Sequence, residues 1–236
     1  MEIKHLLFLL SFIVTAFLFI TIAFLGSFMD EVREDNLNDQ FERMTQDFNN
    51  MQILSMISES YGEEMVCLAF ESKLRELDAY IWDLGEKIDK YRIATEEFNE
   101  DEYYVKQKKL FNENELYYFL LLRSMVEKCN MTKTNVLFFY KDSKICDKCD
   151  DESFVLRDVR YLDTNPDKEV AVFSFDMDLG LSSLELLEKY YEIDQFPCIV
   201  INEEKHCGMK SKDYVMNVIC DNNTIDLNIC NTYFGN

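Results

Sequence analysis

The sequence predicts an α/β domain in the C-terminal half of the chain, after a long helical region that begins with a transmembrane helix. Three observations lead to this fold class. The first 29 residues hold a long uncharged run, residues 30–130 repeat apolar residues at helical spacing, and residues 131–220 alternate strand-like with helix-like stretches. We therefore expect an anchor over 1–29, a helical stalk or hairpin over 30–130, an α/β domain over 131–220 and a tail over 221–236.

Composition limits the classes of function. The 236 residues include 24 Lys and Arg against 45 Asp and Glu, a formal charge of −21. A phosphate backbone repels such a chain, so nucleic acid is not an expected partner. Only His5 and His206 are histidines, and Gly is scarce. Histidine-rich metal sites and Gly-rich phosphate loops are therefore excluded, and we predict no cofactor and no metal.

An uncharged run of 24 residues from Leu6 to Met29 predicts the anchor. As a helix it covers roughly 36 Å, more than a hydrocarbon core of roughly 30 Å. A cleaved signal peptide is the alternative, but its apolar region is shorter and ends in small residues. We expect an uncleaved signal-anchor that contacts membrane lipid. The eight cysteines and the acidic charge favour a single-pass protein with its C-terminal domain outside the cytoplasm.

Apolar residues at alternating spacings of three and four predict the helical region. They are Cys67, Phe70, Leu74, Leu77, Ile81, Leu84, Ile88 and Tyr91. This is the seam of a coiled coil or of a helix hairpin, and it could join a second copy of the chain in a homo-oligomer. Breaks are expected at Tyr61-Gly62 and at 99–101, with a third helix from Glu102 to Glu127. We interpret the acidic residues here as a solvated face, without a catalytic constellation.

Short elements alternate after residue 130. The expected order is a strand over Asn135–Tyr140, a helix through Phe154–Leu162, a strand over Glu169–Asp176, a helix from Ser182 to Glu192, a strand over Phe196–Asn202, a hairpin partner over Lys205–Met209 and a helix over Ser211–Val218. Cys146 and Cys149 form a C-x-x-C pair between the first strand and the first helix. Pro197, one of only two prolines, directly precedes the third strand.

This order, with Cys146-x-x-Cys149 after a buried strand and Phe196-Pro197 before a hairpin, resembles the thioredoxin fold over about residues 133–220. The resemblance implies a central mixed sheet flanked by helices, and a cis proline that lies against the cysteine pair. It also implies a redox-active centre, so the chain would be a membrane-anchored thiol-disulfide oxidoreductase that acts on protein thiols and disulfides.

Three residues would carry that activity. Cys146 would be the exposed nucleophile, stabilised as a thiolate by the helix N-terminus, and Cys149 would resolve the mixed disulfide. Pro197 would shape the groove for a substrate peptide, as the resemblance implies. Between the cysteines, Asp147 opposes a thiolate and Lys148 favours it, so the redox potential stays open.

Other interpretations of the cysteines stay open too. Cys146 and Cys149 could form a permanent structural disulfide, or bind zinc together with Cys207. The remaining thiols could be structural bridges or buried cysteines, and Cys220 and Cys230 are close enough in sequence to staple the tail. The alternative function is a non-catalytic interaction or scaffold protein with a structural disulfide and a coiled-coil stalk.

Overall fold

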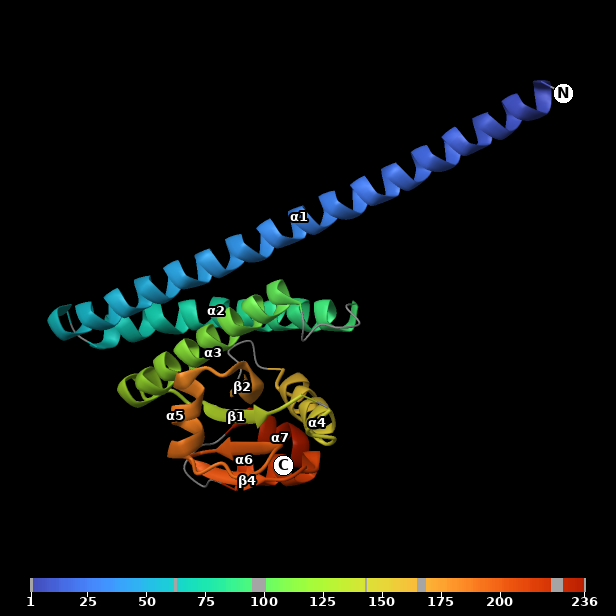
Figure 1. Cartoon of the computed structure of the whole chain (residues 1–236). Coiled ribbons are helices and arrows are strands. Elements are labelled where there is room, and N and C mark those ends of the chain that lie inside the picture. Colours follow the sequence, from blue (N-terminus) through green and yellow to red (C-terminus); the bar gives the residue numbers. More distant parts are fainter. Residues whose placement is uncertain are drawn as a thin grey trace. The chain divides into compact units, whose positions relative to one another are not determined.

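The computed structural model describes residues 2–61, 63–94, 101–142, 144–164, 169–221 and 227–235. They divide into two units, residues 1–46 and residues 47–236. Helix α1 (Glu2–Tyr61) forms the whole of the first unit and ends in the second. Every strand and the other helices belong to the second unit (Figure 1).

The prediction of a transmembrane helix over Leu6–Met29 is wrong. These residues begin helix α1, which continues without a break for 60 residues into strongly charged sequence. Within the part of the chain that the structure describes, no helix has the length and apolar character needed to cross a membrane. An uncharged run was therefore not sufficient evidence for an anchor. The predicted single-pass membrane localisation, with an extracytoplasmic C-terminal domain, is wrong for the same reason.

A four-stranded mixed sheet lies at the centre of residues 47–236. Its strands are β1 (Thr134–Tyr140), β2 (Val170–Asp176), β3 (Cys198–Ile201) and β4 (Glu204–Cys207), in the order β2-β1-β3-β4. Strand β2 runs parallel to β1, whereas β3 is antiparallel to both β1 and β4. Strands β1 and β3 are buried runs of apolar side chains, as central strands usually are.

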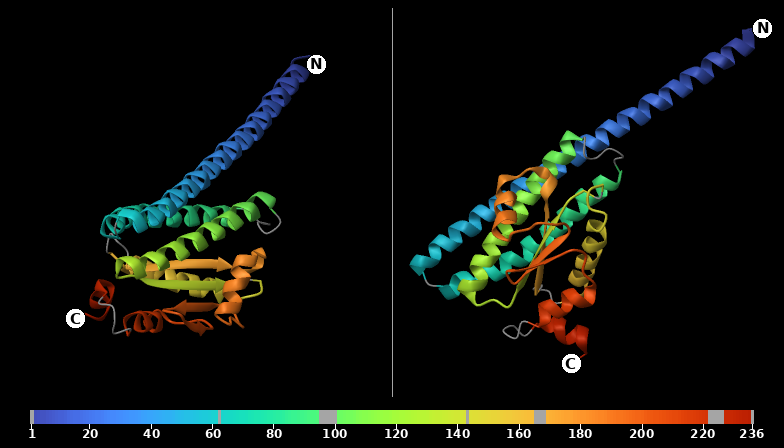
Figure 2. Two further views of the ribbon diagram at one scale, coloured as in Figure 1. Left: turned by 90° about the vertical axis from the view of Figure 1, so that its left-hand side faces the viewer. Right: turned by 60° about the horizontal axis from the view of Figure 1, so that its bottom comes forward.

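Helices cover both faces of this sheet (Figure 2). On one face α4 (Cys149–Leu162), α6 (Lys212–Cys220) and α7 (Asn228–Phe234) enclose a core that includes Val136, Phe138 and Ile199. On the other face Phe173 meets Tyr118 and Phe119 of α3 (Glu102–Cys129). Helix α5 (Ser182–Tyr190) and the 3₁₀ helix η2 (Met177–Leu179) connect β2 with β3. The polypeptide therefore sandwiches a small sheet between two helical layers.

Helix α3 also closes the open edge of β2. The backbone N–H of Ser174 donates to Glu115 Oε1 at 3.2 Å, and that of Asp176 donates to Asn112 Oδ1 at 2.8 Å. An uncovered edge strand presents unpaired N–H groups that can recruit another chain. Two side chains three residues apart on α3 thus satisfy two N–H groups that are two residues apart on β2.

The apolar repeat of α2 (Glu63–Ala94) is buried, with Phe70, Leu77 and Leu84 each at most 1% exposed. The predicted fold class nevertheless needs correction. Helices α1, α2 and α3 contain 60, 32 and 28 residues, whereas none of the strands that the structure describes exceeds seven. The chain is mostly helical with a small mixed sheet, and not an α/β domain on a membrane-anchored stalk. The reason is that α2 and α3 pack onto the same compact unit as the sheet instead of projecting from it.

Candidate functional site

Cys146 and Cys149 form a disulfide at the beginning of helix α4, with their Cα atoms 5.4 Å apart. The short connection from β1 folds back on Asp142, whose carbonyl oxygen accepts from the N–H of Cys146 at 2.9 Å. Cys146 is 5% exposed and Cys149 is 2% exposed. The prediction that Cys146 is an exposed residue is therefore wrong, because the turn folds over it and its neighbour Ile145 takes the surface position, at 71% exposed.

The charges around this disulfide are mostly negative. Three acids, Asp150, Asp151 and Glu152, occupy the first turn of α4. Lys148 pairs with Asp151 at 3.0 Å, and this hydrogen bond raises the pKa of the Lys148 ammonium. A helix N-terminus stabilises a thiolate, but carboxylates in the same turn oppose that effect. The base that could favour a Cys146 thiolate is thus already engaged by a carboxylate.

Pro197 lies at the same end of the sheet as the cysteine pair. Its peptide bond with Phe196 is cis, and its carbonyl oxygen accepts from the N–H of Gly208 at 2.8 Å. Because Phe139 pairs with Cys198, the residue before β3 stands beside the end of β1, where the chain turns towards Cys146. Contact between the two segments is direct, since Lys141 Nζ lies 4.8 Å from the centre of the Phe196 ring.

The other cysteines form three further disulfides. Cys198 pairs with Cys207 across β3 and β4, so Cys207 is not a thiolate ligand for a zinc ion beside Cys146. Cys67 pairs with Cys129, which joins α2 to the end of α3. Cys220 pairs with Cys230, one of the pairings that the sequence left open, and joins α6 to α7. All eight cysteines are therefore oxidised. A redox role for Cys146 and Cys149 requires that their bridge be reduced more easily than the other three.

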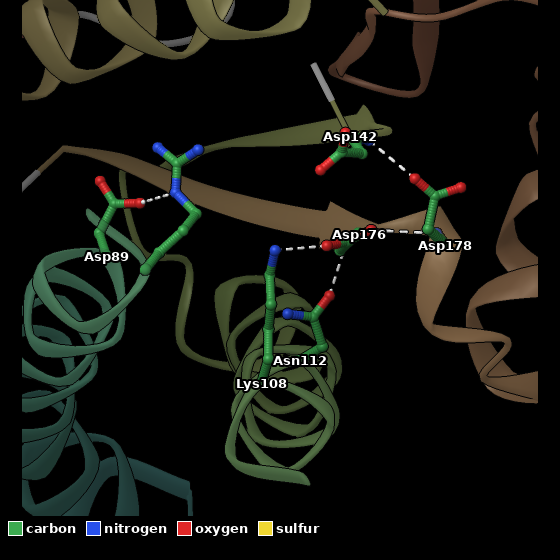
Figure 3. Close-up of polar contacts among 7 residues, drawn as sticks. Asp89, Lys108, Asn112, Asp142, Asp176 and Asp178 are labelled. Atoms are coloured by element: carbon green, nitrogen blue, oxygen red, sulfur yellow. Dashed lines mark hydrogen bonds and ion pairs between the residues drawn. The ribbon is translucent and has the colours of Figure 1, made fainter. Parts of the chain in front are cut away.

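Sequence reasoning missed a cluster of buried polar side chains on α3, at the edge of β2. Lys108 forms an ion pair with Asp176, and these side chains are only 12% and 8% exposed. Figure 3 shows Lys108 and Asn112 pointing from α3 towards Asp176, whose carboxylate also accepts from the N–H of Asp178 at 3.0 Å. One signal for this cluster was available in the sequence. Lys108, Asn112 and Glu115 are spaced four and three residues apart, which places these polar side chains on one face of a helix.

Burial shifts the titration of this cluster. It raises the pKa of the Glu115 carboxyl well above the ordinary value of 4.5, against opposing effects of the Ser174 N–H and of Lys108. Burial alone lowers the pKa of Lys108, but the nearby Tyr140 and Asp176 more than offset it, and the net pKa is above 10.5. Both shifts favour the protonated form. Lys108 is therefore charged, whereas Glu115, on the same face of the helix, is held towards its neutral form.

The site thus consists of a buried disulfide at an acidic helix N-terminus, a cis proline at the same sheet end and a polar cluster on α3. No protein-family model matches the chain, and no curated protein or solved structure matches it either.

Proposed function

We propose that the chain is a thiol-disulfide oxidoreductase in which Cys146 and Cys149 exchange electrons with protein thiols and disulfides. The observation that carries this proposal is the Cys146–Cys149 disulfide at the N-terminus of α4, with Pro197 at the same end of the sheet. The resemblance to thioredoxin-like proteins on these residues supports it. The exposed Ile145 beside Cys146 gives a substrate an apolar contact next to the sulfur.

The exchange proceeds in two steps. In the reduced protein, the Cys146 thiolate attacks one sulfur of a substrate disulfide, forms a mixed disulfide and releases one substrate thiolate. The Cys149 thiolate then attacks Cys146 Sγ, which restores the Cys146–Cys149 bond and releases the second substrate thiolate. The substrate gains two electrons and the cysteine pair loses two. An external dithiol returns these electrons to the pair.

The surrounding charges favour the reducing direction. A strongly oxidising pair has a reduced form that is stabilised, chiefly through an acidic thiol. Here Asp150 and Asp151 oppose the thiolate, and Lys148 is paired with Asp151. We therefore expect a potential closer to that of thioredoxin, about −270 mV, than to the roughly −120 mV of a strong oxidant.

A redox titration with thiol trapping tests the proposal. The Cys146–Cys149 bond should have a reduction potential above about −300 mV, so that it opens in redox buffers that leave the other bridges closed. The variant Cys149→Ser should accumulate a mixed disulfide on Cys146. Cys146→Ser should abolish exchange, whereas the double variant Cys220→Ser/Cys230→Ser, which removes another bridge, should retain it. Asp150→Asn with Asp151→Asn should raise the potential, and Asp158→Asn, later in the same helix, should not.

The second candidate is a non-catalytic interaction protein in which all four disulfides are structural. The burial of Cys146 favours it, because a sulfur that is covered reacts slowly. The same titration separates the two functions, since a Cys146–Cys149 bond that stays closed below about −300 mV is structural. An assembly of two copies through the region predicted as a helical stalk, residues 30–130, stays a prediction, and sedimentation of the chain at increasing concentration tests it.

A further inference from the structure

A cavity of about 430 Å³ lies between helices α2, α3 and α4 and strands β1 and β2. Cavities that bind small molecules have volumes of about 300–1,000 Å³, so this one is large enough for a compact ligand. Aromatic side chains of α2, α3 and β1 form much of its wall: Trp82, Tyr104, Phe111, Tyr118, Phe138 and Tyr140. Cys149 also lines it, at the end nearest to the candidate redox site.

The charged side chains of the wall are largely matched within the protein. Arg160 pairs with Asp78 at 2.6 Å, and Lys108 pairs with Asp176. In Figure 3 a further pair is drawn at the α2 side, where Asp89 accepts from the Nε of Arg92 at 3.0 Å. These three cations already have carboxylate partners. Two further cations of the wall, Lys141 and Arg157, lie over the rings of Phe196 and Phe154, so the wall does not call for a charged ligand.

Glu115 differs from these groups because it is a buried carboxyl group with one oxygen that has no hydrogen-bond partner among the described residues. Its side chain lines the cavity and the residue is 4% exposed. Oε1 accepts from the Ser174 N–H, but Oε2 has no hydrogen-bond partner among the described residues. A buried polar atom without a partner is costly, and native structures rarely keep one without a reason. Oε2 is therefore the atom that a ligand is best placed to satisfy.

We propose that this cavity binds a neutral aromatic small molecule whose amide-type group forms a hydrogen bond with Glu115 Oε2. An amide suits this position because its N–H can donate to a carboxylate and its C=O can accept from a neutral carboxyl group. The ring of the ligand would lie among the aromatic side chains, where offset and edge-to-face contacts are favourable. This proposal does not depend on thiol-disulfide exchange.

Benzamide is a suitable probe, since it combines one aromatic ring with one neutral amide. Trp82 is the only tryptophan in the chain and it lines the cavity, so its fluorescence reports on binding there. We expect saturable quenching or a spectral shift when benzamide is added to the full chain. Benzoate and benzylamine, which have the same ring with a negative or a positive group, should bind at least about tenfold more weakly.

Three variants locate the probe. Glu115→Leu removes the hydrogen bond and should weaken benzamide binding at least about tenfold, whereas Glu115→Gln, which keeps a hydrogen-bonding group, should stay within a few-fold of the wild type. Glu113→Leu, at an exposed position of the same helix, should bind benzamide as the wild type does. Val172→Phe adds a ring to the cavity wall and should abolish the response.

Several results would overturn the proposal. One is the absence of a saturable Trp82 response to any of the three probes at millimolar concentration. Another is a preference for benzoate, which would assign the cavity to an anion. A third is a benzamide response that Val172→Phe leaves unchanged, which would place the probe elsewhere. The thermal unfolding of each variant shows that it is folded, so that a lost response reports on the cavity.

Discussion

Arg160 of α4 and Asp78 of α2 form a two-pronged ion pair, with Nη1–Oδ1 at 3.3 Å and Nη2–Oδ2 at 2.6 Å. The two side chains are 7% and 14% exposed. The guanidinium carbon also lies 4.5 Å from the centre of the Trp82 ring. Eighty-two residues separate the partners in sequence, so this pair ties the helical hairpin to the helix that carries the cysteine pair.

Arg160→Lys should destabilise the protein by about 2 kcal/mol, because lysine cannot make two parallel hydrogen bonds and packs less well on an indole ring. Urea unfolding followed by Trp82 fluorescence measures this loss. Arg123→Lys is the matched control, since Arg123 forms an exposed pair with Glu203 at 3.3 Å. That substitution should cost less than about 1 kcal/mol. Equal losses in the two variants would show that burial of the Arg160 pair contributes nothing.

Lys108→Met should be more damaging than Arg160→Lys. It leaves the Asp176 carboxylate buried without its cation, and breaking such a pair costs about 3–5 kcal/mol. Adding Asp176→Asn should recover a large part of this loss, because the amide keeps an acceptor for the Asp178 N–H without a charge. A double-mutant cycle in urea measures the coupling. A single-variant loss below about 1 kcal/mol would show that the pair behaves as an exposed one.

Local patterns predicted the small sheet but not what covers it. The run from Val136 to Phe139 is a buried strand, as its apolar residues indicated. The spacing of Cys220 and Cys230 allowed the bond that they form, but it did not determine the pairing. The placement of Glu115 could not be predicted in this way. Its partner, the Ser174 N–H, lies 59 residues further along the chain, and only the packing of α3 against β2 brings them together. A charged residue on a helix usually lies on the solvated face. Here Glu115 is buried instead, where it accepts the hydrogen bond of a backbone N–H on the edge strand β2.

Glu115 also predicts a pH dependence. Its pKa is raised in the folded state, so the folded chain holds this proton at pH values where the unfolded chain has lost it. The stability that the neutral carboxyl contributes is therefore complete below about pH 4.5 and is lost as the pH rises above that value. Glu115→Gln removes this titration. The unfolding free energy of the wild type, minus that of Glu115→Gln, should fall by up to about 1.4 kcal/mol per pH unit.

Urea titrations of both proteins at successive pH values from about 4 to 7 measure this difference. Glu113→Gln, at an exposed position of the same helix, is the control and should give a difference that changes little with pH. A difference for Glu115→Gln that stays constant, or that rises with pH, would contradict a raised pKa at Glu115.

The disulfides should differ in their contribution to stability according to the length of chain that each one closes. The Cys67–Cys129 bond joins residues 62 positions apart, and the Cys220–Cys230 bond joins residues 10 apart. In the unfolded chain, the loss of entropy on loop closure is greater for the longer loop. Replacing each pair by serine should therefore destabilise the protein by about 1.6 kcal/mol more for Cys67/Cys129, in urea unfolding under oxidising conditions. An equal or larger loss for the Cys220/Cys230 pair would mean that contacts between α6 and α7, and not loop closure, determine what these bridges contribute.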